Sequence, residues 1–310
     1  MNKIPLAVLF GPTASGKTAL AVEMAKAFNG EVITADSMQV YKGMDIGTAK
    51  PTLEEQQGVP HHMIDVAEPN ENYSLAQYVS AAKACIEEVY RRGKLPILAG
   101  GTGLYIDTLI QNISLSEEEK DESLRKELLK IADSEGNGVL MEALKKVDPE
   151  TANRLHINDT KRIVRALEVY KQTGIPQSEH IRRSKLNESP YKTAKFCITA
   201  ERSALYERIN RRVDIMFDLG LTDEVKALFD KGIDESCTSM QGLGYKEVLW
   251  YLKGDISLAE CKDIIKQGTR RYAKRQVSWF KRETETVPID MFSEKKLEII
   301  QKAMDFHALL

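Results

Sequence analysis

Short apolar runs and longer amphipathic segments follow one another along the first hundred residues. Residues 5–10 read PLAVLF, a run of strand length, and residues 19–28 read ALAVEMAKAF, which is typical of a packed helix. Two further runs, EVITA at residues 31–35 and LPILAG at residues 95–100, also have the length and composition of buried strands. Because strands and helices alternate, the sequence predicts an α/β fold with a parallel sheet covered by helices on both faces.

The pattern becomes purely helical after about residue 115. Apolar positions recur at helical spacing through residues 116–189, with no strand-like run, and KFCITA at residues 195–200 resumes the strand pattern. The last third continues as helices, and VPIDMF at residues 287–292 suits a final edge strand. We therefore predict a core domain formed by residues 1–115 and 190–310 with C-terminal helices, and a helical insertion at residues 116–189.

Composition limits the class of protein and its surroundings. The chain has 310 residues, of which 42% are hydrophobic and 29% are charged, so it can bury a large core. Its formal net charge is -2, so a polyanion would have to bind to local clusters of cations. Since no apolar run is long enough to cross a membrane, we expect a soluble, cytoplasmic protein with no membrane partner. No exposed heptad pattern is evident, so we expect a monomer.

Neither the cysteines nor the histidines predict a protein-bound metal centre. The four cysteines are far apart in the sequence, with no paired spacing that suggests zinc or a disulfide framework. His61 and His62 are adjacent, so their side chains do not point to one face of an element, and a structural role is expected.

The segment GPTASGKT at residues 11–18 matches the pattern G-x-x-x-x-G-K-[ST] between a predicted strand and a predicted helix. Backbone N–H groups of such a loop surround an anion, Lys17 meets phosphate oxygens, and the Thr18 hydroxyl can hold Mg²⁺. The pattern alone does not distinguish a nucleotide from another diphosphate. The predicted site for a diphosphate or a nucleotide such as ATP consists of Gly11, Pro12, Thr13, Ala14, Ser15, Gly16, Lys17 and Thr18.

Asp36 directly follows the predicted strand EVITA. It is therefore expected at the carboxyl end of that strand, which is where open α/β sheets bind their ligands. Three roles remain open from the residues alone. The carboxylate could organise Mg²⁺ through water, accept a proton from an attacking nucleophile, or cap a helix.

Two segments concentrate positive charge. Lys161, Arg162 and Arg165 lie at helical spacing opposite an apolar face that includes Ile163 and Val164. The stretch RRYAKRQVSWFKR at residues 270–282 is the densest basic region and contains no acidic residue. Both are consistent with phosphate contacts to RNA, and a solvated helix face is the alternative for the first.

Several segments together resemble the bacterial tRNA dimethylallyltransferases, also called tRNA isopentenyltransferases. They are GPTASGKT, DSMQVYKGMDIGTAKPT, GVPHHMIDV, GGTGLYI, NDTKRIVRALEVY and RRYAKRQVSWFKR, and they span nearly the whole chain. The resemblance implies a phosphate-loop NTPase fold like that of nucleoside kinases, with a helical insertion domain that contacts tRNA. It implies transfer of a dimethylallyl group from dimethylallyl diphosphate to the exocyclic amine of the adenosine 3′-adjacent to the anticodon. The resemblance further implies that the substrates are tRNAs that read codons beginning with U, that Mg²⁺ is the cofactor, and that diphosphate is released.

The resemblance also implies roles for individual positions. The resemblance implies that the donor's diphosphate occupies the phosphate loop, and we expect Asp36 to accept the proton of the adenosine amine. The implied catalytic residues are Lys17, Thr18, Asp36, Arg208 and Arg212, and which of the two arginines reaches the diphosphate stays open. The implied contacts to the tRNA anticodon stem-loop are Asp36, Ser37, Met38, Gln39, Thr102, Arg125, Lys161, Arg162, Ile163, Val164, Arg165, Lys274 and Arg275.

Three other functions compete with this hypothesis. An ATP-dependent small-molecule kinase would use the same phosphate loop, and an adenylate isopentenyltransferase would use the same donor with a free nucleotide. The long insertion and the basic C-terminal stretch favour tRNA over both. A tRNA-binding protein without catalysis is the third, and the intact Lys17, Thr18 and Asp36 argue against it.

Overall fold

The computed structural model describes residues 3–113, 122–184, 186–307 and 309. The chain divides into two compact units, one formed by Met1–Ile110 with Pro190–Leu310 and the other by Gln111–Ser189. The boundary that we predicted between residues 115 and 116 lies outside the described residues. Within those residues, no helix combines the length and apolar character needed to cross a membrane.

The first unit is built on a six-stranded sheet whose neighbouring strands are all parallel, which confirms the predicted α/β class. The strand order is β3-β2-β4-β1-β5-β6. The connection after β1 therefore leads toward the β3 edge of the sheet, and the connection after β4 leads toward the β6 edge. Ligands of open α/β sheets bind at such a point, outside the carboxyl ends of the strands. The strands are β1 (Ile4–Phe10), β2 (Gly30–Ala35), β3 (His61–His62), β4 (Leu95–Gly100), β5 (Tyr191–Thr199) and β6 (Thr286–Asp290).

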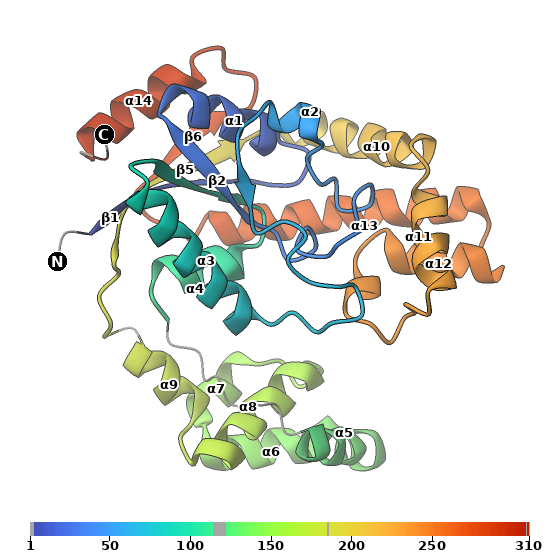
Figure 1. The fold of residues 1–310 in the computed structure, drawn as a ribbon. Coiled ribbons are helices and arrows are strands. Elements are labelled where there is room, and N and C mark those ends of the chain that lie inside the picture. The colour runs from blue at the N-terminus through green and yellow to red at the C-terminus, as the bar shows by residue number, and fades with distance from the viewer. Residues whose placement is uncertain (1–2, 114–121, 185, 308, 310) are drawn as a thin grey trace. The chain divides into compact units, whose positions relative to one another are not determined.

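Helices cover both faces of this sheet (Figure 1). On one face, α1 and α14 bury Leu20, Met24 and Ile300 against alternate residues of the central strands. On the other face, α3 and α4 pack on the sheet. The centres of the rings of Phe10, on β1, and Phe280, farther along the chain, lie 4.7 Å apart. These helices are α1 (Lys17–Ala27), α3 (Leu75–Arg91), α4 (Gly103–Ile110) and α14 (Lys296–Phe306), and α2 (Leu53–Gln56) is a single turn.

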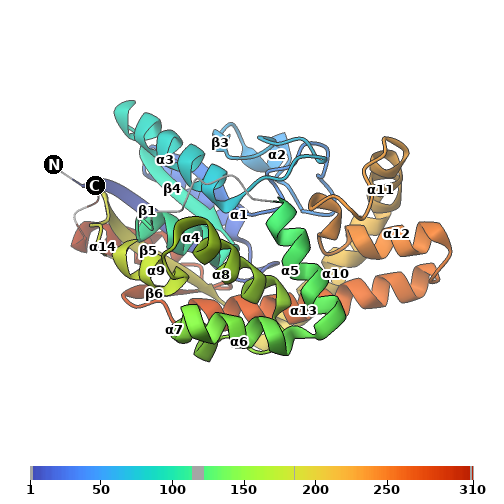
Figure 2. The same cartoon turned by 90° about the horizontal axis from the view of Figure 1, so that it is seen from below.

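A group of helices extends the first unit beyond the sheet, as Figures 1 and 2 both show. The longest of them packs against α10 and α12, and it begins at a capping box formed by Ser257 and Glu260. The group consists of α10 (Arg202–Asp218), α11 (Leu221–Asp230), the 3₁₀ helix η1 (Ser239–Gln241), α12 (Tyr245–Lys253) and α13 (Leu258–Phe280).

Within the described residues, the only regular secondary structure of the second unit is helical, and the unit has a core of its own. Ile163 and Val164 are 0% exposed in that core. Our prediction that these two side chains contact tRNA is therefore wrong, because they point into the unit. The helices are α5 (Glu122–Glu135), α6 (Asn137–Val147), α7 (Pro149–Arg154), α8 (Thr160–Thr173) and α9 (Gln177–Ser184).

Candidate active site

The predicted phosphate loop connects the carboxyl end of β1 to the first residue of α1. Gly16 caps the helix with a φ of 86°, a conformation that favours glycine. Ala14 adopts a φ of 64°, which is unusual for a residue with a side chain. Strained backbone of this kind persists where neighbouring groups hold it, and the Arg208 Nε donates to the Ala14 carbonyl at 3.0 Å.

The loop contains a buried hydroxyl that is left unsatisfied. Ser15 is 3% exposed, and its Oγ has no hydrogen-bond partner within the described residues. Buried polar groups are almost always paired, so an orphaned hydroxyl in such a loop fits a ligand that supplies the missing partner. A phosphate oxygen has the right chemistry, and the helix N-terminus beside it favours negative charge.

Two cations lie at this site, Lys17 within the loop and Arg212 on α10. The Lys17 Nζ donates to the Pro12 carbonyl at 2.7 Å. Burial and the neighbouring Arg212 lower the pKa of Lys17 to about 8, and the carboxylate of Asp36 opposes them. Burial also lowers the pKa of Arg212. Charged groups with this little access to water have most to gain from an anionic partner.

The two arginines left open by the sequence are placed differently. The Arg208 side chain hydrogen-bonds the loop backbone, whereas Arg212 lines a cavity of about 590 Å³. The walls of that cavity include Thr13 and Ala14 of the phosphate loop and residues of α10, α12 and α13. Arg212 is therefore the arginine that faces the cavity.

Asp36 lines the same cavity at the carboxyl end of β2. Its Oδ1 accepts hydrogen bonds from the backbone N–H groups of Met38 at 2.9 Å and Gln39 at 3.4 Å. The residues that follow form a turn and no helix, so the helix-cap role does not apply to Asp36. The Oδ2 has no hydrogen bond within the described part of the chain, which leaves one oxygen available to a ligand.

The turn after Asp36 is held by the loop that follows β4. The Thr102 Oγ1 accepts a hydrogen bond from the Ser37 backbone N–H at 3.1 Å and lies 3.5 Å from the Ser37 hydroxyl. Thr102 was predicted only as a tRNA contact. Here it orients the backbone beside Asp36, and its contact with RNA stays a prediction.

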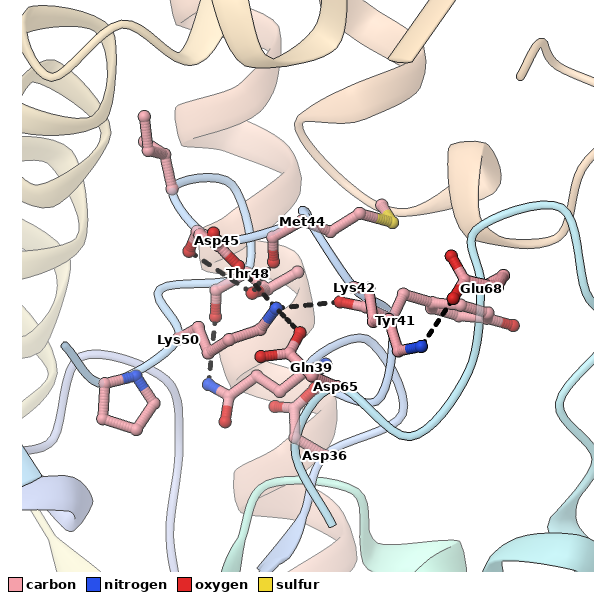
Figure 3. A network of polar contacts seen from close by, with 12 residues as sticks. Asp36, Gln39, Tyr41, Lys42, Met44, Asp45, Thr48, Lys50, Asp65 and Glu68 are labelled. Carbon is pink, nitrogen blue, oxygen red and sulfur yellow. Dashed lines mark hydrogen bonds and ion pairs between the residues drawn. The ribbon is translucent and has the colours of Figure 1, made fainter. Parts of the chain in front are cut away.

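Gln39 uses its side-chain nitrogen within the protein. The Nε2 donates to the carbonyls of Thr48 at 3.2 Å and Ala49 at 3.1 Å (Figure 3). Only the Oε1 of this side chain is left for the tRNA contact that we predicted for Gln39. The amide thereby holds Thr48 and Ala49, which also line the cavity.

A lysine with a buried side chain, which the sequence analysis did not predict, helps to hold the loop of residues 44–50 in place. The Lys50 Nζ donates to the Tyr41 carbonyl at 2.8 Å and pairs with Asp45 and Asp65, at 2.5 Å each (Figure 3). The loop is also held from α11, because the Glu224 carboxylate accepts the backbone N–H groups of residues 45, 46 and 47. Lys50 belongs to the segment DIGTAKP, but its acidic partners could not be read from spacing.

The predicted cations of the second unit divide into two groups. The Arg125 guanidinium contacts both carboxylate oxygens of buried Glu168 at 3.0 Å, and Arg165 lies 3.7 Å from the same carboxylate. Lys161 and Arg162 are exposed, and Arg162 pairs with Asp159 at 2.8 Å. Arg125 therefore has a structural partner, while Lys161 and Arg162 face solvent as a phosphate contact requires.

Helix α13 carries both exposed cations and a buried polar side chain. Lys274 and Arg275 are exposed, and the Arg275 guanidinium lies 5.7 Å from the centre of the Tyr272 ring. Gln276 is 5% exposed and hydrogen-bonds two loops of the site, a role that the sequence did not predict.

Comparison with known proteins gives the family. The family model described as IPP transferase matches residues 39–283, which is more than half of the chain. The chain is 52% identical over 280 residues to the tRNA dimethylallyltransferase of Caldanaerobacter subterraneus, covering 90% of this chain and 89% of that protein. It is 50% identical over 275 residues to the enzyme of the same name from Acetivibrio thermocellus, covering 89% and 88%.

Solved structures agree with these sequence matches. The full-length tRNA isopentenylpyrophosphate transferase of Bacillus halodurans is 44% identical, with a TM-score of 0.74 and coverage of 99% of this chain and 98% of that chain. A eukaryotic dimethylallyltransferase acting on tRNA is 32% identical, with a TM-score of 0.84 and coverage of 98% and 80%. The phosphate loop, the parallel sheet and these matches together show that the chain belongs to the IPP transferase family.

Proposed function

We propose that this protein transfers a dimethylallyl group from dimethylallyl diphosphate to tRNA. The acceptor is the exocyclic amine of the adenosine 3′-adjacent to the anticodon, in tRNAs that read codons beginning with U. The observation that carries the proposal is one cavity whose walls include both the anion-binding loop, through Thr13 and Ala14, and the carboxylate of Asp36. Close relatives named tRNA dimethylallyltransferase support the same activity.

The donor's diphosphate is the leaving group, and it gains negative charge as the allylic carbon–oxygen bond breaks. The loop amides, the buried Ser15 hydroxyl, Lys17 and Arg212 are placed to stabilise that charge. Because these groups are fixed before the reaction begins, they need little reorganisation in the transition state.

Asp36 acts on the acceptor, the adenosine of tRNA. An adenine amine is a weak nucleophile, so a carboxylate that accepts its proton helps as the nitrogen–carbon bond forms. The electron pair of the broken carbon–oxygen bond leaves with the diphosphate. The free Oδ2 of Asp36 is the acceptor for the proton, since Oδ1 is occupied by backbone N–H groups.

Mg²⁺ fits the site only together with the donor. The described residues hold no cluster of three or more His, Cys, Asp or Glu side chains that could bind an ion alone. Mg²⁺ commonly takes one or two protein ligands and completes its shell with phosphate oxygens and water. We propose that the Thr18 hydroxyl and the donor's diphosphate bind it together. When bound, it supplies positive charge to the leaving group.

The deciding experiment measures transfer of radiolabel from dimethylallyl diphosphate, with Mg²⁺, to unmodified tRNA. The native chain should label the tRNA, and Asp36→Asn should lower the rate by about 100-fold or more while still binding tRNA. Asp263→Asn, at an exposed position of α13, is the matched control and should transfer at the native rate. Equal rates for Asp36→Asn and the native chain would remove Asp36 from the role of base.

Two further arms test the competing functions. Labelled ATP with small-molecule acceptors would reveal a kinase, and free adenosine monophosphate in place of tRNA would reveal an adenylate prenyltransferase. Transfer to tRNA, with neither of these activities, is the expected result.

A further inference from the structure

We propose that Gln276 is a positioning residue that holds the phosphate loop and the turn bearing Asp36 in a fixed relation. This inference rests on the proposed function and concerns how the two halves of the site are aligned. Both ends of the Gln276 side-chain amide are used. The Oε1 accepts the Thr13 backbone N–H at 2.9 Å, and the Nε2 donates to the Gly101 carbonyl at 2.9 Å.

The first contact fixes the phosphate loop from outside. Thr13 precedes Ala14, whose φ is 64°, and the Ala14 carbonyl is held in turn by the Arg208 Nε at 3.0 Å. Side chains from α13 and α10 therefore hold the two peptide groups that flank the Thr13–Ala14 peptide, next to the strained residue. A loop conformation that costs free energy persists when its surroundings specify it in this way.

The second contact reaches the acceptor side of the cavity. Gly101 is followed by Thr102, whose Oγ1 accepts the Ser37 backbone N–H at 3.1 Å, and Ser37 follows Asp36. Gly101 has no room for a side chain, because an added Cβ would lie 2.4 Å from the Gln276 Nε2. The chain of contacts thus runs from Thr13 through one buried amide to the backbone beside Asp36.

The same helix also carries exposed cations, of which Arg271 and Arg275 line the cavity. Arg271, Lys274 and Arg275 are exposed on α13, while Gln276 is 5% exposed. Substitution of Gln276 therefore leaves the candidate RNA contacts of the helix in place. Misalignment of the phosphate loop and Asp36 would lower kcat, whereas weaker RNA binding would raise the KM for tRNA, so kinetics can distinguish the two effects.

Two variants at this position test the inference. Gln276→Met keeps the length of the side chain and removes both hydrogen bonds. Gln276→Glu keeps the acceptor for Thr13 and loses the donor to Gly101. We expect kcat for prenyl transfer to fall about 10- to 100-fold in Gln276→Met, with the KM for tRNA within twofold of native. We expect Gln276→Glu to lose kcat as well, because a carboxylate oxygen would then face the Gly101 carbonyl.

A third variant approaches the contact from its other partner. Gly101→Ala would push on the Gln276 amide and should reproduce the loss of kcat, even if a Gln276 variant does not fold. The matched control is Gln57→Glu, an exposed glutamine outside the cavity, which should behave as native. All assays are run below the melting temperature of each variant.

The outcomes separate this inference from the proposed function. Failure of the native chain to label tRNA would count against the function itself. If the native chain is active and the folded variants keep kcat within threefold, or if their loss lies wholly in the KM for tRNA, Gln276 has no positioning role. A lower melting temperature with native kcat would likewise overturn the inference.

Discussion

Lys17 combines two properties that matter at the scale of a single residue. It stands at the start of α1, where backbone N–H groups already favour an anion, and its own pKa is lowered to about 8 by burial and by Arg212. Above that pH the free protein holds a neutral amine at this position. The donor's diphosphate, in contrast, favours the charged ammonium group, so binding of the donor should take up a proton.

Donor affinity should therefore depend on pH in a stated direction. The Kd for dimethylallyl diphosphate should be nearly constant below pH 8 and should rise by up to about tenfold per pH unit above it. Isothermal titration between pH 7 and pH 9.5 measures this. Lys17→Arg, whose guanidinium stays charged, should bind with a Kd that varies little over the same range. A native Kd that is flat up to pH 9.5 would contradict the prediction.

At the scale of elements, the loop of residues 44–50 depends on contacts from elsewhere. The Glu224 carboxylate of α11 accepts three consecutive backbone N–H groups, from residues 45 to 47, at 2.7 to 3.1 Å. It also accepts the Tyr245 hydroxyl at 2.6 Å, and burial together with this carboxylate raises the pKa of Tyr245. The loop contributes Gly47 and Thr48 to the cavity, so α11 helps to shape a site that its side chains do not line.

Removal of this carboxylate should affect both stability and transfer. Glu224→Ala would leave several donors without a partner, and we expect the free energy of unfolding to fall by about 1–3 kcal/mol. Urea denaturation measures that loss, and the transfer assay should show a lower rate with tRNA. Glu207→Ala, at an exposed position of α10, serves as the control and should change neither quantity. Native behaviour of Glu224→Ala would show that the loop is held without α11.

Elements and motifs differed in how well the sequence predicted them. The phosphate loop and Asp36 were predicted because their signals are local: a strand, a short motif and a helix in succession. β3 was missed because it has only two residues, His61 and His62, too few for a periodic pattern. Gln276 was missed for a different reason, since its partner Thr13 is 263 residues away and no spacing rule joins them.

At the scale of the whole molecule, charge is balanced overall and unevenly distributed. The net charge of -2 gives little long-range attraction for RNA, so binding must depend on local cations. Lys274 and Arg275 are exposed on α13, and Lys161 and Arg162 are exposed on α8 of the second unit. The family assignment makes tRNA the expected partner of these side chains.

Binding of tRNA should weaken steeply with salt. Each lysine or arginine that neutralises a phosphate adds about 0.7 to 0.9 to the slope of log affinity against log salt concentration. Lys274→Ala and Arg275→Ala should each reduce that slope by about one. Lys274 does not line the cavity, so Lys274→Ala should leave kcat at saturating tRNA unchanged. Filter binding from 50 to 300 mM salt measures the slope. Lys302→Ala, on α14 and outside the cavity, is the control, and an unchanged slope in both α13 variants would refute the assignment.

The two edge strands of the sheet affect how readily copies of the protein can aggregate by pairing their strands. One edge strand is the two-residue β3. The other is β6, which contains Pro288 and therefore lacks one backbone N–H donor. A long edge strand with unpaired backbone N–H and C=O groups can pair with a strand of a neighbouring molecule. Here a second copy would gain few hydrogen bonds by adding a strand on either side, which protects the protein from that route of aggregation.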